Sequence, residues 1–138
     1  MNKKLLMLGG GFLQNFVIEK AKSMDYYVYC LDADPNAPGF QIADEYAVVN
    51  IVDEEACLAY ARDKQVNGVL TAATDFGVLT MSRIAEAMYL PGINYRSAKI
   101  IKNKASVRKL LFEAHADDTG YAYEIGSMDE IAEILPKM

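Results

Sequence analysis

The sequence is poor in residue types that several classes of protein need. Its 138 residues include two cysteines and one histidine. Cys30 and Cys57 form no close-spaced pair, and Cys30 falls within an apolar run, so we expect Cys30 to be a buried thiol and the setting to be reduced and cytoplasmic. With His115 as the only histidine and no cysteine cluster, the sequence does not support a zinc site. It also contains no P-loop, nucleophile elbow or Ser/His/Asp set.

The chain is also poor in bases and has no long apolar run. Fourteen lysines and arginines stand against nineteen acids, which gives a net charge of −5. Nonspecific nucleic-acid binding needs phosphate-neutralising bases, so this class is disfavoured. No apolar stretch approaches the length that spans a bilayer. Lys3-Lys4 and the apolar residues after them imitate a signal peptide, but the glycines at 9–11 end the run too soon. We therefore expect neither nucleic acid nor membrane as a partner.

Strand and helix patterns alternate over residues 5–92. With 52% apolar and 24% charged residues, the chain can bury the core of about one domain. The apolar runs at 5–8, 26–31 and 68–70 are nearly continuous, which is typical of parallel strands covered on both faces. A shorter strand is expected at 46–49, and helices after Gly11, after Asp53 as N-cap, and over 78–88. The sequence predicts an α/β fold with a doubly wound, mostly parallel Rossmann-like sheet.

The pattern changes after residue 92. Short helices are expected at 97–102 and 104–114, followed by a strand at 121–125. Ser127 to Glu130 matches a capping box that opens a last helix. One strand and one helix cannot bury a core of their own. We therefore expect residues 1–115 to form the Rossmann-like domain with trailing helices, and residues 116–138 to begin a second, incomplete domain.

The glycines at 9–11 lie where the first strand turns into the first helix. A helix end there points unpaired N–H groups at the strand end, and the missing Cβ atoms let an anion approach the backbone. Gln14 stands where a GxGxxG fingerprint has its last glycine, so a tight turn without a ligand is the alternative. Asp32 ends the next strand and favours a ligand, although the segment 32–39 also reads as a turn-rich loop. We expect the sheet to be open and electropositive at this end.

Two further features have both a structural and a functional interpretation. Thr74 or Asp75, after the fourth strand, is most simply an N-cap, but this position also faces the crevice where open α/β sheets bind ligands. Between Arg96 and Lys109 the chain has six bases and no acid. Such a run is usually a solvated helix face, and facing a polyphosphate is the alternative.

Five short segments in this order resemble the N-terminal part of ATP-grasp ligases. Relatives of that kind include biotin carboxylase, glycinamide ribonucleotide synthetase, the ATPase subunit of phosphoribosylaminoimidazole carboxylase and the large subunit of carbamoyl phosphate synthetase. The segments are Met7 to Leu13, Leu31 to Pro38, Ala43-Asp44, Leu90 to Ile93, and Asn103 to Ala114. Gln14 and Asn15 depart from the glycine and arginine of some purine-pathway members, which weakens a transfer of their substrates.

The resemblance implies a pre-ATP-grasp domain over residues 1 to about 95 that helps to bind a carboxylate- or phosphate-bearing substrate. Lys104 would approach the nucleotide phosphates, and residues 121–135 would be the first strand and helix of the ATP-grasp domain. No catalytic or metal-binding residue is implied within this chain. The implied substrate contacts are Gly9, Gly10, Gly11, Phe12, Asp32, Thr74 and Asp75.

In such an enzyme ATP, with Mg²⁺, phosphorylates a carboxylate, and an amine or thiol then displaces the phosphate. The resemblance implies that this chain alone is inactive and binds neither ATP nor Mg²⁺ tightly. Its partner would be the remaining ATP-grasp lobe, in the same or a separate chain. The apolar strand and helix expected at residues 121–135 have no companion, which favours pairing with that lobe or a homodimer.

Two other functions fit parts of the sequence. An NAD-binding regulatory or oxidoreductase domain would use the glycines at 9–11 and Asp32. It leaves the ligase-like segment at 103–114 unexplained. A degenerate half-enzyme would only associate with a partner chain, through the unfinished unit at its end.

Overall fold

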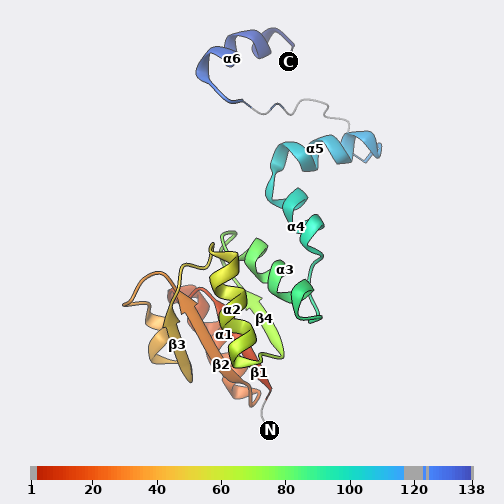
Figure 1. Ribbon diagram of the computed structural model, residues 1–138. Coiled ribbons are helices and arrows are strands. Elements are labelled where there is room, and N and C mark those ends of the chain that lie inside the picture. The colour runs from red at the N-terminus through yellow and green to blue at the C-terminus, as the bar shows by residue number, and fades with distance from the viewer. Residues whose placement is uncertain (1–2, 117–122, 124, 138) are drawn as a thin grey trace. The chain divides into compact units, whose positions relative to one another are not determined.

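The computed structural model describes residues 3–116, 123 and 125–137. The chain forms two compact units, Met1–Ala98 and Lys99–Met138. The first unit holds the sheet, and the second consists of short helices in its described part (Figure 1). The predicted boundary between residues 115 and 116 stays a prediction, because most residues that would open the second domain lie outside the described ones.

The sheet has four parallel strands in the order β3-β2-β1-β4. The strands are β1 (Lys4–Leu8), β2 (Tyr27–Asp32), β3 (Glu45–Val48) and β4 (Gly68–Thr71). Leu8 at the end of β1 lies opposite Leu31 of β2 and Thr71 of β4. The predicted α/β fold with a parallel sheet is confirmed. All four strands end at one edge, which we call the carboxyl edge together with the loops that follow them.

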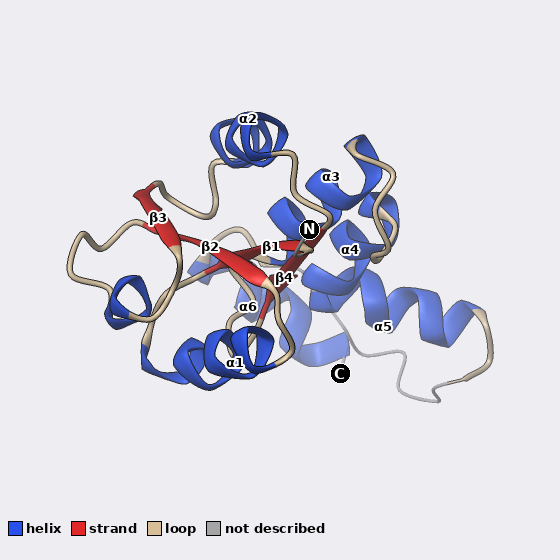
Figure 2. Cartoon of the chain, turned by 90° about the horizontal axis from the view of Figure 1, so that it is seen from below, coloured by secondary structure: helices blue, strands red, loops and turns tan. Residues whose placement is uncertain are grey.

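Helices cover both faces of the sheet, as Figures 1 and 2 show. One face carries α1 (Phe12–Ser23) and the short 3₁₀ helix η1 (Pro38–Gln41), and the other carries α2 (Glu54–Lys64) and α3 (Val78–Ala87). This double cover explains the near-continuous apolar run of β1. Its Leu6 and Leu8 are fully buried on the α2 and α3 side, and Met7 is buried on the α1 side.

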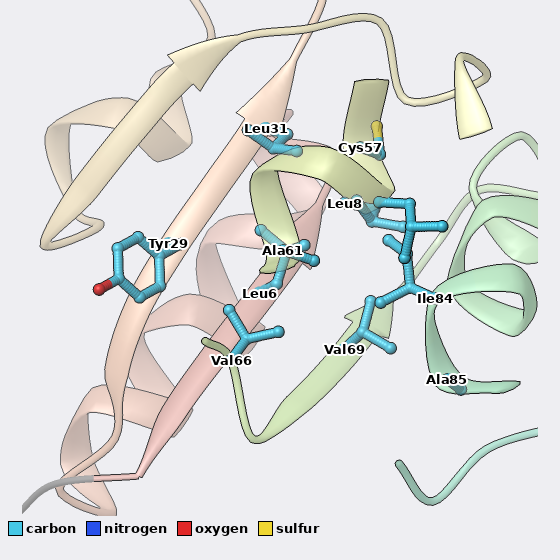
Figure 3. Packing of buried hydrophobic residues seen from close by; sticks show 11 residues of the cluster. Leu6, Leu8, Tyr29, Leu31, Cys57, Ala61, Val66, Val69, Ile84 and Ala85 are labelled. Atoms are coloured by element: carbon cyan, nitrogen blue, oxygen red, sulfur yellow. The ribbon is translucent and has the colours of Figure 1, made fainter. Parts of the chain in front are cut away.

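The larger core lies between the sheet and the helices α2 and α3 (Figure 3). Leu6, Leu8 and Leu31 from the strands meet Cys57 of α2 and Ile84 of α3, and none of these side chains is exposed to solvent. Burial of this kind contributes about 1.5–3 kcal/mol for each large aliphatic side chain. It fixes the positions of the strand ends that form the carboxyl edge.

The helix starts test two predicted caps. Asp53 Oδ1 accepts a hydrogen bond from the Ala56 amide at 3.0 Å, so the predicted cap of α2 is confirmed. The predicted cap of α3 at Thr74 or Asp75 is wrong, because α3 begins after Gly77 and has no side-chain cap. The structure gives the reason: a Cβ on Gly77 would lie 2.6 Å from Thr71 Oγ1, so only glycine allows the helix to begin this close to β4.

Helix α4 (Tyr95–Lys102) follows α3 across the boundary of the units, and the second unit contains α5, α6 and the 3₁₀ helix η2 (Leu135–Lys137). α5 (Lys104–Glu113) is capped by Asn103, whose Oδ1 accepts from the Ser106 amide at 2.9 Å. α6 (Met128–Ile134) follows Ser127. Neither α5 nor α6 contains a buried residue. These helices therefore have little core of their own in the described part.

The capping box predicted at the start of α6 is not formed, although the helix does begin after Ser127. Glu130 accepts from the Gly126 amide at 3.0 Å and from the Ser127 hydroxyl at 3.3 Å, but Ser127 makes no cap bond to the helix backbone. The strand predicted at 121–125 lies outside the described residues, except for Tyr123 and Ile125, which belong to no strand. Within the part of the chain that is described, no helix combines the length and the apolar character that crossing a bilayer requires.

Candidate functional site

The glycine turn between β1 and α1 is shaped by backbone geometry. Gly9 has a φ of 102°, in the left-handed region that side chains disfavour. Its amide donates to the Leu31 carbonyl at 2.8 Å, and the Gly10 amide donates to Asp32 Oδ2 at 2.7 Å. Two of the three glycine amides are therefore used within the protein.

Asp32 at the end of β2 has both carboxylate oxygens engaged. Oδ2 accepts from Gly10, and Oδ1 accepts from the Asp34 amide at 2.9 Å. The second bond closes a local turn, as in the turn-rich loop interpretation of this segment. The first bond places a carboxylate on an amide that an anionic ligand would otherwise use.

A second glycine contact joins the turn to the β2–β3 connection. The Gly39 amide donates to the Gly10 carbonyl at 2.7 Å. A Cβ on Gly39 would lie 2.9 Å from both Cα and O of Gly10, and a Cβ on Gly10 would lie 3.0 Å from Cys30 Sγ. Close packing alone thus accounts for Gly10 and Gly39.

Gln14 fills the space above the turn. Its side chain is buried, with 7% exposure, and its Nε2 donates to the Ala72 carbonyl in the loop after β4. Its Oε1 would lie 2.8 Å from a Cβ on Gly11. The expected open, electropositive edge built by backbone amides is wrong at this turn, because Gln14 and Asp32 occupy it. Gly11 still precedes α1 without a side-chain cap, and Phe12 is 69% exposed.

A hollow of about 460 Å³ lies at the end of β4, and we call it the β4 hollow. Thr71 Oγ1 donates to the Leu8 carbonyl at 3.0 Å, and Thr74 Oγ1 accepts from the Phe76 amide at 3.2 Å. Asp75 is exposed, and its carboxylate has no hydrogen-bond or ion-pair partner among the residues that the structure describes. The lining residues are Thr71, Ala72, Ala73, Thr74, Asp75, Val78, Met81 and Ile93.

The carboxyl edge has acids and no bases. The loops at 33–37, 49–53 and 72–77 each contain one aspartate, and neither they nor the glycines at 9–11 include a lysine, arginine or histidine. Bases collect at the opposite end of the sheet, at the start of β1 and in the last turns of α1 and α2. The side-chain charge at the carboxyl edge is therefore negative.

The residues predicted to bind ligands fall into four places. Gly9, Gly10 and Asp32 form the closed turn, and Thr74 and Asp75 line the hollow, which the hydrogen bond from Gln14 to Ala72 ties to that turn. Gly11 and Phe12 lie at the start of α1. Lys104 is exposed as the first residue of α5 and belongs to the second unit.

Sequence reasoning missed the burial of Gln14 and the apolar side of the hollow. The polar partner of Gln14 lies 58 positions away, so local pattern could not find it. Its place in the glycine fingerprint was a signal that something other than a phosphate fills the turn. Met81 and Ile93 line the hollow, and neither their apolar character nor the place of Ile93 in a family-like segment predicted this.

The two thiols are buried and unreactive. Burial, together with the nearby Asp32, raises the pKa of Cys30 to about 12, and burial beside Asp53 raises the pKa of Cys57 to about 11. Both thiols are thus protonated at neutral pH and are poor nucleophiles. The described residues include no group of three or more histidine, cysteine or acidic side chains that could hold a metal ion.

Similar proteins have been solved and characterised. Phosphoribosylglycinamide synthetase from Anaerococcus prevotii superposes with a TM-score of 0.80 at 23% identity, over 100% of this chain and 35% of that one. N5-carboxyaminoimidazole synthetase from Staphylococcus aureus, solved as a complex with ADP, gives a TM-score of 0.66 at 17% identity, over 83% of this chain and 31% of that one. These likenesses support the fold.

Sequence relatives agree with this likeness. Formate-dependent phosphoribosylglycinamide formyltransferase from Prochlorococcus marinus is 26% identical over 110 residues, which make up 80% of this chain and 28% of the relative. This chain thus spans about a third of the length of the curated relatives it matches. The family model of the ribonucleotide synthetase preATP-grasp domain matches residues 2–86.

The resemblance to the N-terminal part of ATP-grasp enzymes is thereby confirmed, and nothing in the closed glycine turn favours the NAD-binding alternative. The chain belongs to the ribonucleotide synthetase preATP-grasp domain family.

Proposed function

We propose that this chain supplies the substrate-side domain of an ATP-dependent carboxylate–amine or carboxylate–thiol ligase. In the complete enzyme, ATP would phosphorylate a carboxylate, and an amine or thiol would displace phosphate from the acyl phosphate. The observation that carries the proposal is the family match over residues 2–86. The β4 hollow supports it, because ligands of open α/β sheets bind beyond the carboxyl ends of the strands.

The residues proposed for substrate divide by what the geometry leaves accessible. Thr74 and Asp75 line the hollow, and the exposed Phe12 begins α1, so these residues would contact substrate. Gly9, Gly10 and Asp32 would act by shaping the turn, since the hydrogen bonds of their polar groups are made within the protein. Gly11 would allow the close packing of Gln14.

ATP and Mg²⁺ are proposed for the complete enzyme. The similar structure from S. aureus holds ADP. In this chain Lys104 is exposed at the first position of α5, where its ammonium group could approach a phosphate. The described residues do not fit a magnesium site, so the remaining ATP-grasp lobe would have to supply the metal ligands. We place this enzyme in the cytoplasm, where its two free, buried cysteines stay reduced.

The chain alone should bind ATP weakly. A helix end contributes about 0.3–2 kcal/mol to holding an anion, whereas millimolar affinity already needs about 4 kcal/mol. We expect no measurable heat when ATP is titrated into this chain in a calorimeter. A micromolar dissociation constant would contradict the proposal that tight ATP binding needs the remaining ATP-grasp lobe.

The proposed function is tested by joining this chain to the remaining ATP-grasp lobe, in one polypeptide or by co-expression. ADP formation is then measured with panels of carboxylates and amines. We expect turnover that requires both a carboxylate and a nucleophile, and a large loss in Lys104→Ala. Lys109→Ala is the matched control, because Lys109 lies on the same helix and makes only an exposed pair with Glu113 at 4.0 Å. Absence of ADP formation with every carboxylate would count against a ligase.

A further inference from the structure

A groove of about 450 Å³ lies at the end of the sheet opposite the carboxyl edge, between α1 and the first residues of β1 and β4. We call it the amino-end groove, and Figure 2 views the molecule from this end. We propose that it binds a small amphiphilic carboxylate, in which one carboxylate is joined to an aliphatic body. The inference is independent of the proposed function, because the groove lies away from the edge assigned to substrate.

The lining of the groove is mainly apolar. Leu5 of β1, Leu70 of β4 and Val17 of α1 line it, and all three pack against the core on the α1 face of the sheet while remaining partly exposed. Met24, at the end of α1, is 56% exposed and also lines the groove. Apolar surface that is rimmed by polar residues marks an interaction site. The aliphatic body of the ligand would cover these side chains.

The charged residues of the lining are all of one sign. Lys3 and Lys20 line the groove, and no acid of the described chain does so. Neither ammonium group has a hydrogen-bond or ion-pair partner among the described residues. By contrast, Lys22 and Lys64 at the same end of the sheet each hold a carboxylate at 2.8 Å. In a chain with a net charge of −5, two lysines without partners beside an apolar surface select an anionic ligand.

The acids that are nearest in the sequence do not reverse this charge. Glu19 precedes Lys20 on α1, and adjacent residues of a helix do not face each other. Asp25 lies in the turn after α1. Both acids are exposed to water, and neither lines the groove. The two lysines therefore set the sign of the charge along the groove.

Asn67 adds a neutral donor just before β4. Its Oδ1 accepts a hydrogen bond from the Lys4 backbone amide at 2.9 Å, which orients the side-chain amide. Its Nδ2 has no acceptor among the residues that the structure describes. Asn67 can therefore donate to the anion that the lysines attract, and hydrogen bonds to an ionised acceptor are the stronger kind.

The ligand needs both a charged and an apolar part. The volume of the groove is within the range of about 300–1,000 Å³ that is typical of small-molecule sites. Inorganic phosphate or acetate would meet the lysines but leave the apolar lining in water. A neutral alcohol would cover the apolar lining but leave both ammonium groups without a partner. A carboxylate on a short aliphatic chain satisfies both parts.

The test is a titration of this chain followed by amide chemical shifts in nitrogen–proton NMR spectra. The probes are hexanoate, hexanol, hexylammonium, acetate and inorganic phosphate. We expect hexanoate to shift the amides of residues 17–24 and 67–70 with a dissociation constant in the millimolar range. The other four probes should shift these amides less at equal concentration. The same titration of the chain joined to its ATP-grasp lobe should give the same dissociation constant for hexanoate.

Matched variants locate the carboxylate. Lys20→Met keeps an unbranched side chain without the charge and should weaken hexanoate binding about threefold, the size expected for one exposed ion pair. Lys3→Met should have a similar effect, and the double variant should weaken binding about tenfold if the two lysines act independently. Arg62→Met removes a positive charge from α2, on the other face of the sheet, and should change binding less. All three side chains are exposed, so dispersed amide spectra should persist in each variant.

The inference is overturned if any other probe binds as tightly as hexanoate, if hexanoate does not shift these amides, or if the double lysine variant binds hexanoate unchanged. A groove that no probe enters, in a chain that sediments as a dimer, is a contact surface for a second copy instead. Loss of hexanoate binding when the ATP-grasp lobe is joined would assign the groove to that lobe. None of these results bears on the proposed ligase function, which is measured by ADP formation.

Discussion

The two units of this chain differ in how they use apolar side chains. In Met1–Ala98, the sheet buries large side chains on both faces, and Leu6, Leu8 and Leu31 have no exposure. In the second unit, α5 and α6 carry Leu110 at 52% exposure and Met128 at 80% exposure, and neither helix has a buried residue. An amphipathic pattern therefore predicts a helix in both units but a core only where layers meet.

The sharpest test of this difference is hydrogen exchange. Core strands and helices exchange through global unfolding, whereas helices with few buried contacts open locally. We expect the amides of Leu6, Val28 and Leu31 to be protected close to the global free energy of unfolding, about 5–15 kcal/mol. The amides of α6 should exchange within the dead time. Slow exchange in α6 would mean that its apolar residues are covered in solution, for instance in a homodimer.

A pair of leucine substitutions compares the units side chain by side chain. Leu8→Ala removes a fully buried side chain and should lower the free energy of unfolding by about 2–5 kcal/mol. Leu110→Ala removes one that is half exposed and should change it by less than about 0.5 kcal/mol. Guanidinium titration followed by circular dichroism measures both. Equal losses in the free energy of unfolding would contradict the difference in core packing between the two units.

A pair of glycine substitutions compares how tightly the backbone is packed in the two units. Gly39→Ala places a Cβ 2.9 Å from the Gly10 backbone, which cannot yield as a flexible side chain can, so a loss of about 1–3 kcal/mol is expected. Gly126→Ala in the second unit meets only the end of the Glu130 side chain, at 3.3 Å. The free energy of unfolding of Gly126→Ala should be within about 0.5 kcal/mol of that of the parent protein. Thermal melts of the two variants decide whether backbone contact matters only in the sheet unit.

The smallest expected difference concerns pH. Hydrogen bonds from Lys64 at 2.8 Å and from Tyr27 at 3.1 Å lower the pKa of Glu45. A lowered pKa contributes stability that is present above the ordinary value of about 4.3 and is lost as pH falls through the folded value. Glu45→Gln should therefore flatten the acid limb of stability below about pH 4.3. Glu113→Gln, which loses an exposed pair with Lys109, should leave that limb unchanged.

The sequence was sufficient for the elements whose signal is local. The parallel strands follow from apolar runs covered on two faces, and the cap of α2 follows from an aspartate three residues before the amide it binds. The helix expected over 78–88 is found as α3, but its cap was misplaced, because the contact of Gly77 with Thr71 depends on tertiary packing. The prediction that the glycine turn is open failed because it too depends on a tertiary contact. Its filling by Gln14 is a contact between segments 58 residues apart.

The position of the candidate site at the sheet edge could be predicted from the sequence, but the hydrogen bonding of its side chains could not. Parallel strand ends meet at one edge, so Asp32, Thr74 and Asp75 could be assigned to it from the sequence alone. Whether each carboxylate is free depends on hydrogen-bond partners that no spacing reveals. Asp32 binds the Gly10 amide, whereas Asp75 has no partner among the described residues.

The backbone contact between Gly10 and Gly39 has a consequence for anyone who re-engineers this domain. The Gly39 amide nitrogen lies 2.7 Å from the Gly10 carbonyl oxygen, and there is no room for a methyl group on Gly39. The β1–α1 turn and the β2–β3 connection therefore depend on each other's backbone position. A β1–α1 turn grafted from another protein should pack correctly only if the β2–β3 connection of that protein is grafted together with it. Libraries for altered specificity should therefore hold this pair fixed and diversify the other side of the sheet edge, around residues 72–78.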